Sequence, residues 1–334
     1  MEFFNRIKLI GCFLLLFSIS CISAIDTPNN SEEKNIEKVI RALSKMPCDL
    51  NNPAIHKISG GLTNANYKVT IGNTTYFMRL SCGQNDILQS SLEREWLCTS
   101  SISSANIAPK PLLYVPGEGV IISEFIERQQ GDVDLNDKET LQRFITIVKK
   151  LHQLDVKFPS QFCPFESIQL YTDNAIAAGA DIPSDLAQTV LPWVKQLKQT
   201  LVLSPIKVPC HLDLHHGNLL NDGENLWILD WEYAAMGDPL FDIAVTSAAE
   251  NFSDEQMQYL LEIYLDRTPS QEEFQYLYKM RILADARWAS WCFLQAKISP
   301  LNAPFFEFGE GFLEQCLNRI FFLTASMSPL AVKS

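Results

Sequence analysis

The sequence predicts an α+β fold of two lobes, with a small N-terminal lobe built on an antiparallel sheet and a large, mainly helical C-terminal lobe. Three observations support this fold class. A hairpin pattern surrounds residues 72–73, apolar runs alternate with spaced polar residues at 211–230, and residues 239–325 have helical periodicity. We expect the N-terminal lobe to span residues 35–126 and the C-terminal lobe residues 127–330.

Composition and charge restrict the functional classes. The 334 residues are 47% hydrophobic and 20% charged, with a formal net charge of −12. This acidic balance argues against a nucleic-acid-binding surface and is compatible with a small cationic substrate. The nine cysteines lack metal-ligand spacing, so we expect them to be mainly reduced and buried.

The small lobe has clear local signals. Residues 35–46 predict an amphipathic helix, because apolar side chains recur at helical spacing at Ile36, Val39, Ile40 and Leu43. Two strand patterns, 67–71 and 74–80, flank the turn-forming pair Gly72-Asn73. Further along, residues 139–154 predict an amphipathic helix. Its predicted buried face consists of Leu141, Phe144, Ile145, Val148 and Leu151.

The polar residues at 211–230 have the order and spacing of a kinase catalytic loop. Asp213 follows His211 by two residues, Asn218 follows by five more, and Asp230 ends the apolar run 226–229. Phosphoryl transfer needs one carboxylate near the attacking hydroxyl, and a second carboxylate with an amide oxygen to hold Mg²⁺. We therefore expect Asp213 to be catalytic and Asn218 and Asp230 to be metal ligands.

A zinc site is the alternative interpretation of this loop, because His215 and His216 lie close to His211 and Asp213. No Cys-x-x-Cys or His-Glu-x-x-His pattern accompanies them. The kinase interpretation therefore takes precedence.

Upstream segments suit ATP binding. The small-residue stretch from Gly60 to Asn64 precedes the hairpin, where a loop could approach the nucleotide phosphates closely. Arg79 on the second hairpin strand is the expected phosphate-positioning cation, paired with Glu95 rather than Glu93 of the following helix. The strand 119–126 is expected to supply the hinge between the lobes. Its backbone groups from Glu124 to Ile126 would bond the adenine edge.

These residues resemble the choline/ethanolamine kinase branch of the aminoglycoside-phosphotransferase-like kinases. The resemblance extends over about residues 55–320 and rests on four stretches: 60–67, 210–218, 228–244 and 287–299. It implies a protein-kinase-like fold, with ATP and Mg²⁺ as cofactors. It also implies structural roles for His211 and Asp242.

The resemblance also implies a substrate site. A quaternary ammonium group cannot donate a hydrogen bond, so aromatic faces and nearby carboxylates recognise it. Trp288 and Trp291 lie three residues apart on one helical face, and the family positions matching Glu232 and Tyr233 also contribute to such a pocket. We expect an O-kinase acting on choline or a similar cationic amino alcohol.

Two departures keep other functions open. Phenylalanines occupy the segment 305–312 where choline kinases have tyrosines, and Val245 replaces a usual asparagine. A thiamine or aminoglycoside kinase remains an alternative. So does a catalytically idle, kinase-like binding module acting as a secreted effector.

The N-terminus has the pattern of a targeting signal. Arg6 and Lys8 precede an uncharged run from Leu9 to Ile25, typical of a signal peptide or short membrane anchor. Residues 26–34 are expected to form a polar linker. Any membrane contact is expected through residues 1–25 alone. Because the reaction needs ATP, we expect export into ATP-containing surroundings, anchorage with the enzyme facing the cytoplasm, or a wrongly assigned start codon.

Overall fold

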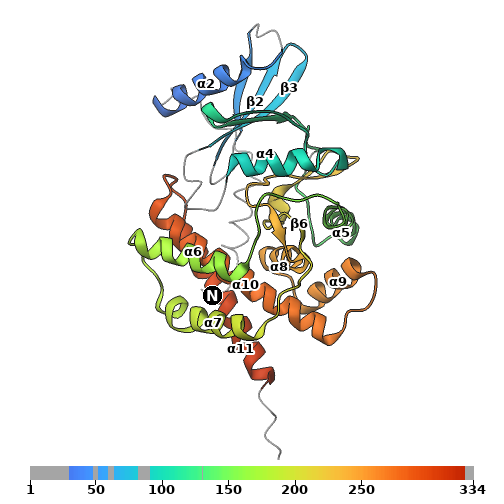
Figure 1. Ribbon diagram of the computed structural model, residues 1–334, viewed down its shortest axis with the longest axis vertical. Coiled ribbons are helices and arrows are strands. Elements are labelled where there is room, and N and C mark those ends of the chain that lie inside the picture. Colours follow the sequence, from blue (N-terminus) through green and yellow to red (C-terminus); the bar gives the residue numbers. More distant parts are fainter. Residues whose placement is uncertain (1–29, 48–51, 59–63, 82–90, 130, 328–334) are drawn as a thin grey trace, which may run out of the picture. The chain divides into compact units, whose positions relative to one another are not determined.

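The computed structural model describes residues 30–47, 52–58, 64–81, 91–129 and 131–327 (Figure 1). Three expected features lie outside these ranges in whole or in part. They are the targeting segment 1–25, the first residues of the 26–34 linker, and residues 60–63 of the expected phosphate loop.

The described chain forms two compact units. The first, here called the sheet unit, comprises described residues of 14–161 and 208–236, and the helical unit comprises those of 162–207 and 237–334. The chain thus leaves the sheet unit after residue 161 and returns to it for residues 208–236. This division differs from the lobe boundary expected at residues 126–127, because contacts attach the expected catalytic loop to the sheet unit.

A five-stranded antiparallel sheet in the order β1-β2-β3-β5-β4 is the framework of the sheet unit. The expected hairpin is confirmed: Ile71 pairs with Thr74 across the turn, and Gly72 takes a left-handed φ of +57° that glycine tolerates. The strand bounds are β1 Ala54–Ile58, β2 Asn64–Ile71, β3 Thr74–Ser81, β4 Pro111–Val115 and β5 Val120–Glu124.

Helix α2 (Asn30–Leu43) packs on one face of this sheet, where Val39 and Leu43 join a buried core. One expectation fails here. The helix begins at Asn30, so residues 30–34 are helical rather than linker, because Glu32 and Glu33 suit its first turn. Of the apolar residues at helical spacing, Ile40 is exposed, because Val39, Ala42 and Leu43 already fill the stripe that faces the sheet.

Two further helices complete the sheet unit. Helix α4 (Leu92–Ser101) begins after Ser91, whose hydroxyl accepts from the Arg94 backbone N–H. Helix α5 (Lys138–His152) confirms the amphipathic expectation, because every residue of the predicted apolar face is buried. It packs against β6 (Val208–Cys210) and β8 (Leu226–Ile228). Strands β7 (Leu219–Asn221) and β8 form a second hairpin, and β9 (Ala235–Gly237) pairs with β6.

The helical unit confirms the expected all-helical C-terminal region. Helix α10 is buried along residues 280–295 and packs against α6, α8 and α11 (Figure 1). Its N-terminus carries a capping box, in which Ser270 and Glu273 exchange side-chain-to-backbone hydrogen bonds. The bounds are α6 Pro164–Ala177, a π-helical turn Leu186–Val190, α7 Leu191–Thr200, α8 Pro239–Ala249, α9 Asp254–Leu265, α10 Gln271–Ile298 and α11 Phe305–Met327.

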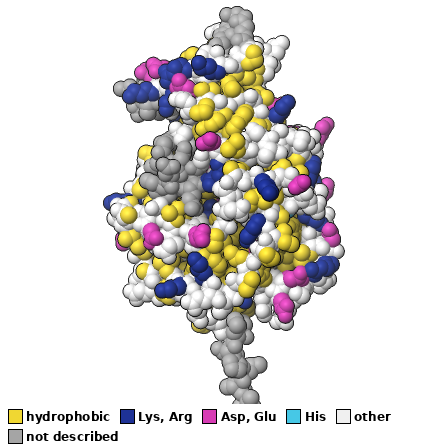
Figure 2. Space-filling view, in the orientation of Figure 1, with side chains coloured by type: hydrophobic (Ala, Val, Ile, Leu, Met, Phe, Trp, Pro, Cys, Tyr) yellow, Lys and Arg dark blue, Asp and Glu magenta, His cyan; other side chains and the backbone are white. Residues whose placement is uncertain are grey.

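Among the described helices, none is both long and apolar enough to span a membrane. Acidic and basic side chains are interspersed on the face drawn in Figure 2.

Candidate active site

The loop after β6 brings Asp213 and Asn218 together. The Asn218 side-chain amide donates to the Asp213 backbone carbonyl at 2.8 Å and to its carboxylate Oδ2 at 3.0 Å. A short 3₁₀ turn, His216–Asn218, brings the chain back so that these bonds can form. Asp213 and Asn218 are 7% and 4% exposed. The five-residue spacing noted in the sequence thus closes a compact, hydrogen-bonded loop.

The backbone of Leu229 attaches the next strand to this loop. Its N–H donates to the Asn218 carbonyl at 2.8 Å, and its own carbonyl lies 2.8 Å from His211 Nε2. Because a carbonyl can only accept, His211 Nε2 carries the proton in this bond. His211 therefore holds the strand end beside the loop. Asp230, the next residue, is fixed close to Asn218.

Backbone strain accompanies this arrangement. Asp230 has a φ of +65° and Leu212 a φ of +69°. Non-glycine residues rarely adopt this left-handed region, and such conformations concentrate at functional sites where the surrounding contacts enforce them.

Arg79 connects the sheet, helix α4 and Asp230. Met78 and Leu80 face the core beneath α2, so strand alternation directs Arg79 to the opposite face of β3. There its Nη1 donates to Glu95 Oε2 at 3.1 Å and also to Asp230 Oδ1. Of the two glutamates considered in the sequence, Glu95 therefore makes the ion pair.

These buried charges shift one another's pKa values. Burial raises the pKa of Glu95 to about 7, against the opposing pull of Arg79. Burial alone would also raise the pKa of Asp230, but the charge and hydrogen bond of Arg79 outweigh it and hold that pKa below its usual value. Asp230 is therefore ionised at neutral pH, as a metal-binding carboxylate must be.

Glu232, two residues after Asp230, is held by two residues from other elements. Its carboxylate Oε2 accepts from Asn64 Nδ2 at 2.9 Å. Its backbone carbonyl accepts from Arg94 Nε at 3.1 Å and Nη2 at 2.7 Å. Asn64, expected to contact the nucleotide, thus bonds the carboxylate expected to contact the substrate. Arg94 was missed in the sequence, and its place between Glu93 and Glu95 was the available signal.

The histidines of the loop are engaged in its internal structure. His215 Nδ1 accepts from the Gly217 backbone N–H at 3.1 Å. Burial, followed by the neighbouring His216 and His211, lowers the pKa of His215 to about 3. His215 is therefore neutral at physiological pH, and its Nε2, 3.9 Å from Asp213 Oδ1, forms no ion pair with that carboxylate. Two ring nitrogens that a zinc site would use, His215 Nδ1 and His211 Nε2, are instead bonded to backbone groups of Gly217 and Leu229.

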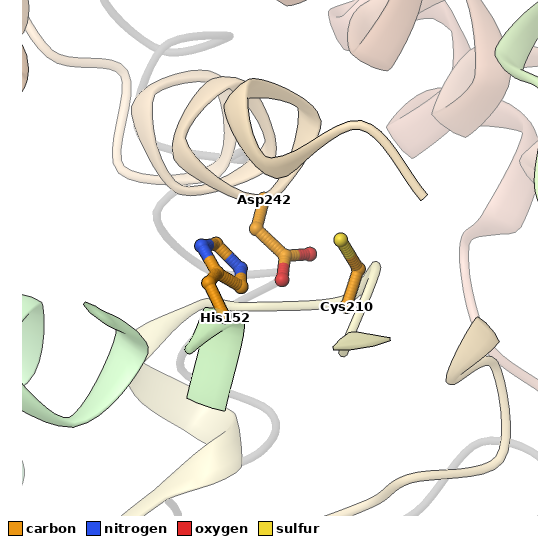
Figure 3. A group of neighbouring side chains, drawn as sticks. All are labelled: His152, Cys210 and Asp242. Carbon is orange, nitrogen blue, oxygen red and sulfur yellow. The ribbon is translucent and has the colours of Figure 1, made fainter. Parts of the chain in front are cut away.

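Other expected residues of the sheet unit occupy defined positions. Glu124 ends β5 and its N–H donates to the Lys110 carbonyl at 2.9 Å. Ile126 follows β5 and is partly buried, and Tyr233 is 7% exposed. His152 of α5 and Cys210 of β6 are both buried, with a ring nitrogen and the sulfur within 4.8 Å of each other (Figure 3).

The remaining expected residues belong to the helical unit. Asp242 lies in the first turn of α8 and is fully buried. On α10, the Trp288 and Trp291 rings form an edge-to-face pair with centroids 5.7 Å apart. Phe312 stacks on Trp288 at 6.0 Å, and Phe305 meets Trp291 edge-on at 5.8 Å. The phenylalanines that replace the family tyrosines are thus direct neighbours of the tryptophan pair.

Trp288 also has a cation of the protein itself beside it. The Arg287 guanidinium carbon lies 5.3 Å from the Trp288 ring centroid and within 5.8 Å of the Phe162 and Tyr171 centroids. Its Nε donates to Ser167 Oγ at 3.3 Å. In this conformation the Trp288 ring therefore already makes a cation–π contact.

Comparison with known proteins also points to phosphotransferases. The phosphotransferase enzyme family matches residues 54–275. Protein LicA of Haemophilus influenzae is 26% identical over 272 residues, covering 78% of this chain and 76% of that protein. Thiamine kinase of Shigella boydii serotype 4 is 26% identical over 228 residues, covering 67% and 71% respectively.

Solved structures show the same architecture. Choline kinase LicA from Streptococcus pneumoniae superposes with a TM-score of 0.72 at 21% identity, covering 88% of this chain and 100% of that one. The choline/ethanolamine kinase family protein from Mesorhizobium loti gives 0.71 at 21% identity, covering 86% and 95%. These similarities establish a protein-kinase-like fold.

Proposed function

Because this chain belongs to the phosphotransferase enzyme family, we propose that it is an ATP- and Mg²⁺-dependent kinase for the hydroxyl group of a small cationic alcohol of the choline class. One observation carries the proposal. The sheet unit brings Asp213, Asn218 and Asp230 together through the backbone bonds of Leu229, and places Arg79 on Asp230. A kinase site needs this combination of carboxylates, amide and cation.

The donor set fits Mg²⁺. Asp230 supplies a carboxylate held ionised by Arg79. The amide nitrogen of Asn218 is engaged by Asp213, so its amide oxygen is the atom suited to a metal. Hard oxygen donors of this kind are the ligands that Mg²⁺ prefers, and the bound ion would neutralise charge on the ATP phosphates.

The protein's own residues would perform the remaining tasks. Asp213 would orient the substrate hydroxyl and accept its proton during attack on the γ-phosphate. Arg79, held by Glu95, would position the phosphates, and the segment from Glu124 to Ile126 would bond the adenine edge. Such positioning and charge stabilisation supply most of the rate enhancement in phosphoryl transfer.

The relatives and the aromatic pair support a cationic substrate. LicA proteins are among both the sequence relatives and the structural neighbours, one of them a choline kinase. Trp288 and Trp291, with Glu232 and Tyr233, are the residues that we propose for the substrate site. Thiamine is a second candidate because thiamine kinases also match two thirds of the chain. Thiamine likewise joins a hydroxyethyl group to a positively charged ring.

The test is a substrate panel with a matched pair of variants. Full-length protein with ATP and Mg²⁺ would be assayed for ADP release with choline, ethanolamine, thiamine and an aminoglycoside. Asp213→Ala should lower turnover by roughly 10²–10⁴-fold, while ATP with Mg²⁺ still raises the Tm. Glu224→Gln, on the exposed β7–β8 turn, should retain activity. Near-wild-type turnover by Asp213→Ala would refute the mechanism.

A further inference from the structure

Arg94 of α4 binds the backbone of the segment that follows Asp230. Its guanidinium donates twice to one acceptor, the Glu232 carbonyl, through Nε at 3.1 Å and Nη2 at 2.7 Å. Hydrogen bonds from a charged donor are stronger than those between neutral groups, and the planar guanidinium also fixes their direction. Arg94 and Glu232 both belong to the sheet unit. Helix α4 therefore holds the main chain two residues beyond an expected metal ligand.

Neighbouring contacts show that this segment lies along α4. Glu95, the residue after Arg94, pairs with the same guanidinium that holds Asp230. One turn further along α4, Cys98 Sγ donates to the Ala234 carbonyl at 3.8 Å. Burial raises the pKa of this thiol to about 12, so the sulfur keeps the proton that it donates. The helix thus contacts the segment at several points, and the Arg94 bonds lie in the middle of this contact.

The position of Asp230 depends on contacts on both sides of it in the chain. Its φ of +65° is unfavourable for a residue with a side chain, so the surrounding bonds must enforce it. On the preceding side, the Leu229 N–H donates to the Asn218 carbonyl. On the following side, the Arg94 bonds hold the Glu232 carbonyl. Without the Arg94 bonds, the main chain at Asp230 would relax toward ordinary backbone angles, and its carboxylate would shift relative to Asn218.

We propose that Arg94 is a positioning residue, which keeps Asp230 in the geometry that binds Mg²⁺ by holding the backbone two residues further along. This inference rests on the proposed kinase function and adds a residue that acts on the metal site through the main chain. Groups that orient metal ligands by hydrogen bonds typically change metal affinity or activity 10–100-fold when they are replaced. The loss of Arg94 should therefore weaken the response to Mg²⁺.

The experiment measures the Mg²⁺ dependence of ATP binding in full-length wild-type protein, Arg94→Met and Arg94→Lys. The readout is the Mg²⁺ concentration that gives half of the rise in Tm produced by ATP. Arg94→Met keeps a long side chain but loses the donors, so this midpoint should rise about 10-fold. Arg94→Lys should give an intermediate midpoint, at least 2-fold above wild type, because one flexible ammonium replaces two fixed donors.

A kinetic measurement separates metal positioning from a loss of substrate binding. At limiting Mg²⁺, Arg94→Met should lower kcat by a factor similar to the shift in its midpoint, while the KM for the alcohol stays within 2-fold of wild type. Arg143→Met is the matched control. Arg143 of α5 also donates to a backbone carbonyl of the sheet unit, that of Glu224 at 3.3 Å, but this carbonyl lies on the β7–β8 turn. Its replacement should leave the Mg²⁺ midpoint unchanged.

The outcomes are distinguishable. A wild-type midpoint in Arg94→Met, or an equal shift in Arg143→Met, overturns the inference. If Arg94→Met does not fold, the Arg94→Lys variant decides, and a wild-type midpoint in that variant has the same meaning. If the wild-type protein phosphorylates no alcohol, the proposed substrate class fails, while the Mg²⁺ midpoints still test Arg94 because they need no turnover. If ATP with Mg²⁺ does not raise the Tm of the wild-type protein, the proposed function and this inference both fail.

Discussion

At the scale of single residues, Arg79 holds together the charges of the proposed site. It is 5% exposed and pairs with two carboxylates that come from α4 and from the end of β8. A buried charge loses its hydration, so removal of its partner is costly. The Arg79 guanidinium therefore stabilises the fold and, in the proposed mechanism, also positions the ATP phosphates.

Replacement of Arg79 should reveal both roles. Arg79→Met leaves Glu95 and Asp230 buried without their cation, and should lower the free energy of unfolding by about 3–5 kcal/mol. Arg79→Lys keeps the charge but loses the planar donor geometry. Its free energy of unfolding should therefore fall less than that of Arg79→Met, and its KM for ATP should rise. Urea unfolding and ATP titrations would measure these effects. Equal stability of Arg79→Met and wild type would contradict the structural role.

The pKa of Glu95 predicts a pH-dependent stability. Its folded-state pKa is raised to about 7 from 4.5, so the folded protein keeps a proton that the unfolded chain releases. The stability from this group is complete below pH 4.5 and is lost as the pH rises through 7. Glu95→Gln should flatten this fall, measured as urea midpoints between pH 4.5 and 7.5. The pKa of Asp230 is lowered, so its contribution to stability is lost only as the pH falls below 3.8, outside this range. Parallel profiles of variant and wild type would contradict the prediction.

At the scale of elements, α10 organises the helical unit. It is 28 residues long and carries the tryptophan pair and Arg287 on one continuous helix. Its start is defined by the Ser270 capping box, which Arg267 extends by an ion pair with Glu273 at 2.6 Å. The proposed substrate residues begin at Trp288, about five turns further along. The cap should therefore influence stability without influencing catalysis.

Ser270→Ala tests this separation. Loss of the cap should lower the free energy of unfolding by about 1 kcal/mol, because the first helical N–H groups lose their acceptor. The kcat and KM values should stay within 2-fold of wild type. Thr268→Ala, an exposed position two residues earlier, is the control and should change stability by less than about 0.5 kcal/mol. A catalytic defect in Ser270→Ala would show coupling along the helix.

At the scale of the whole molecule, the proposed residues are shared between the two units. The sheet unit contains the residues proposed for ATP, metal and proton transfer. Of the residues proposed for the substrate, Glu232 and Tyr233 belong to the sheet unit, and Trp288 and Trp291 belong to the helical unit. Outside the described residues, we propose that residues 1–25 act as a signal peptide or membrane anchor, because their charge and hydropathy pattern matches such segments.

Deletion of residues 1–25 tests this proposal. The shortened chain should keep the Tm and kcat of the full-length protein, because the proposed site lies within the described residues. Its distribution between soluble, membrane and exported fractions should change. Cell fractionation with an activity assay on each fraction would measure this. Identical distributions of the two forms would exclude a targeting role.

Local physics explains which parts of the fold could be predicted. The β2–β3 hairpin and α5 were predictable because turn chemistry and apolar periodicity act over a few neighbouring residues. The N-terminal boundary of α2 was harder to predict, because polar residues 30–34 resemble a linker although Glu32 and Glu33 suit the first turn of a helix. The exposure of Ile40 depended on which side of the helix meets the sheet. No local rule specifies that choice.

By itself, the sequence determined the chemistry that the site can carry: the spacing of Asp213, Asn218 and Asp230, and the fold class that surrounds them. Only the tertiary structure decided the partners of these residues. It joined Arg79 to Glu95 and Asp230, and placed Asn64 on Glu232. The reason is physical, since spacing and periodicity act along the chain, whereas charge pairing and burial depend on segments up to 168 residues apart.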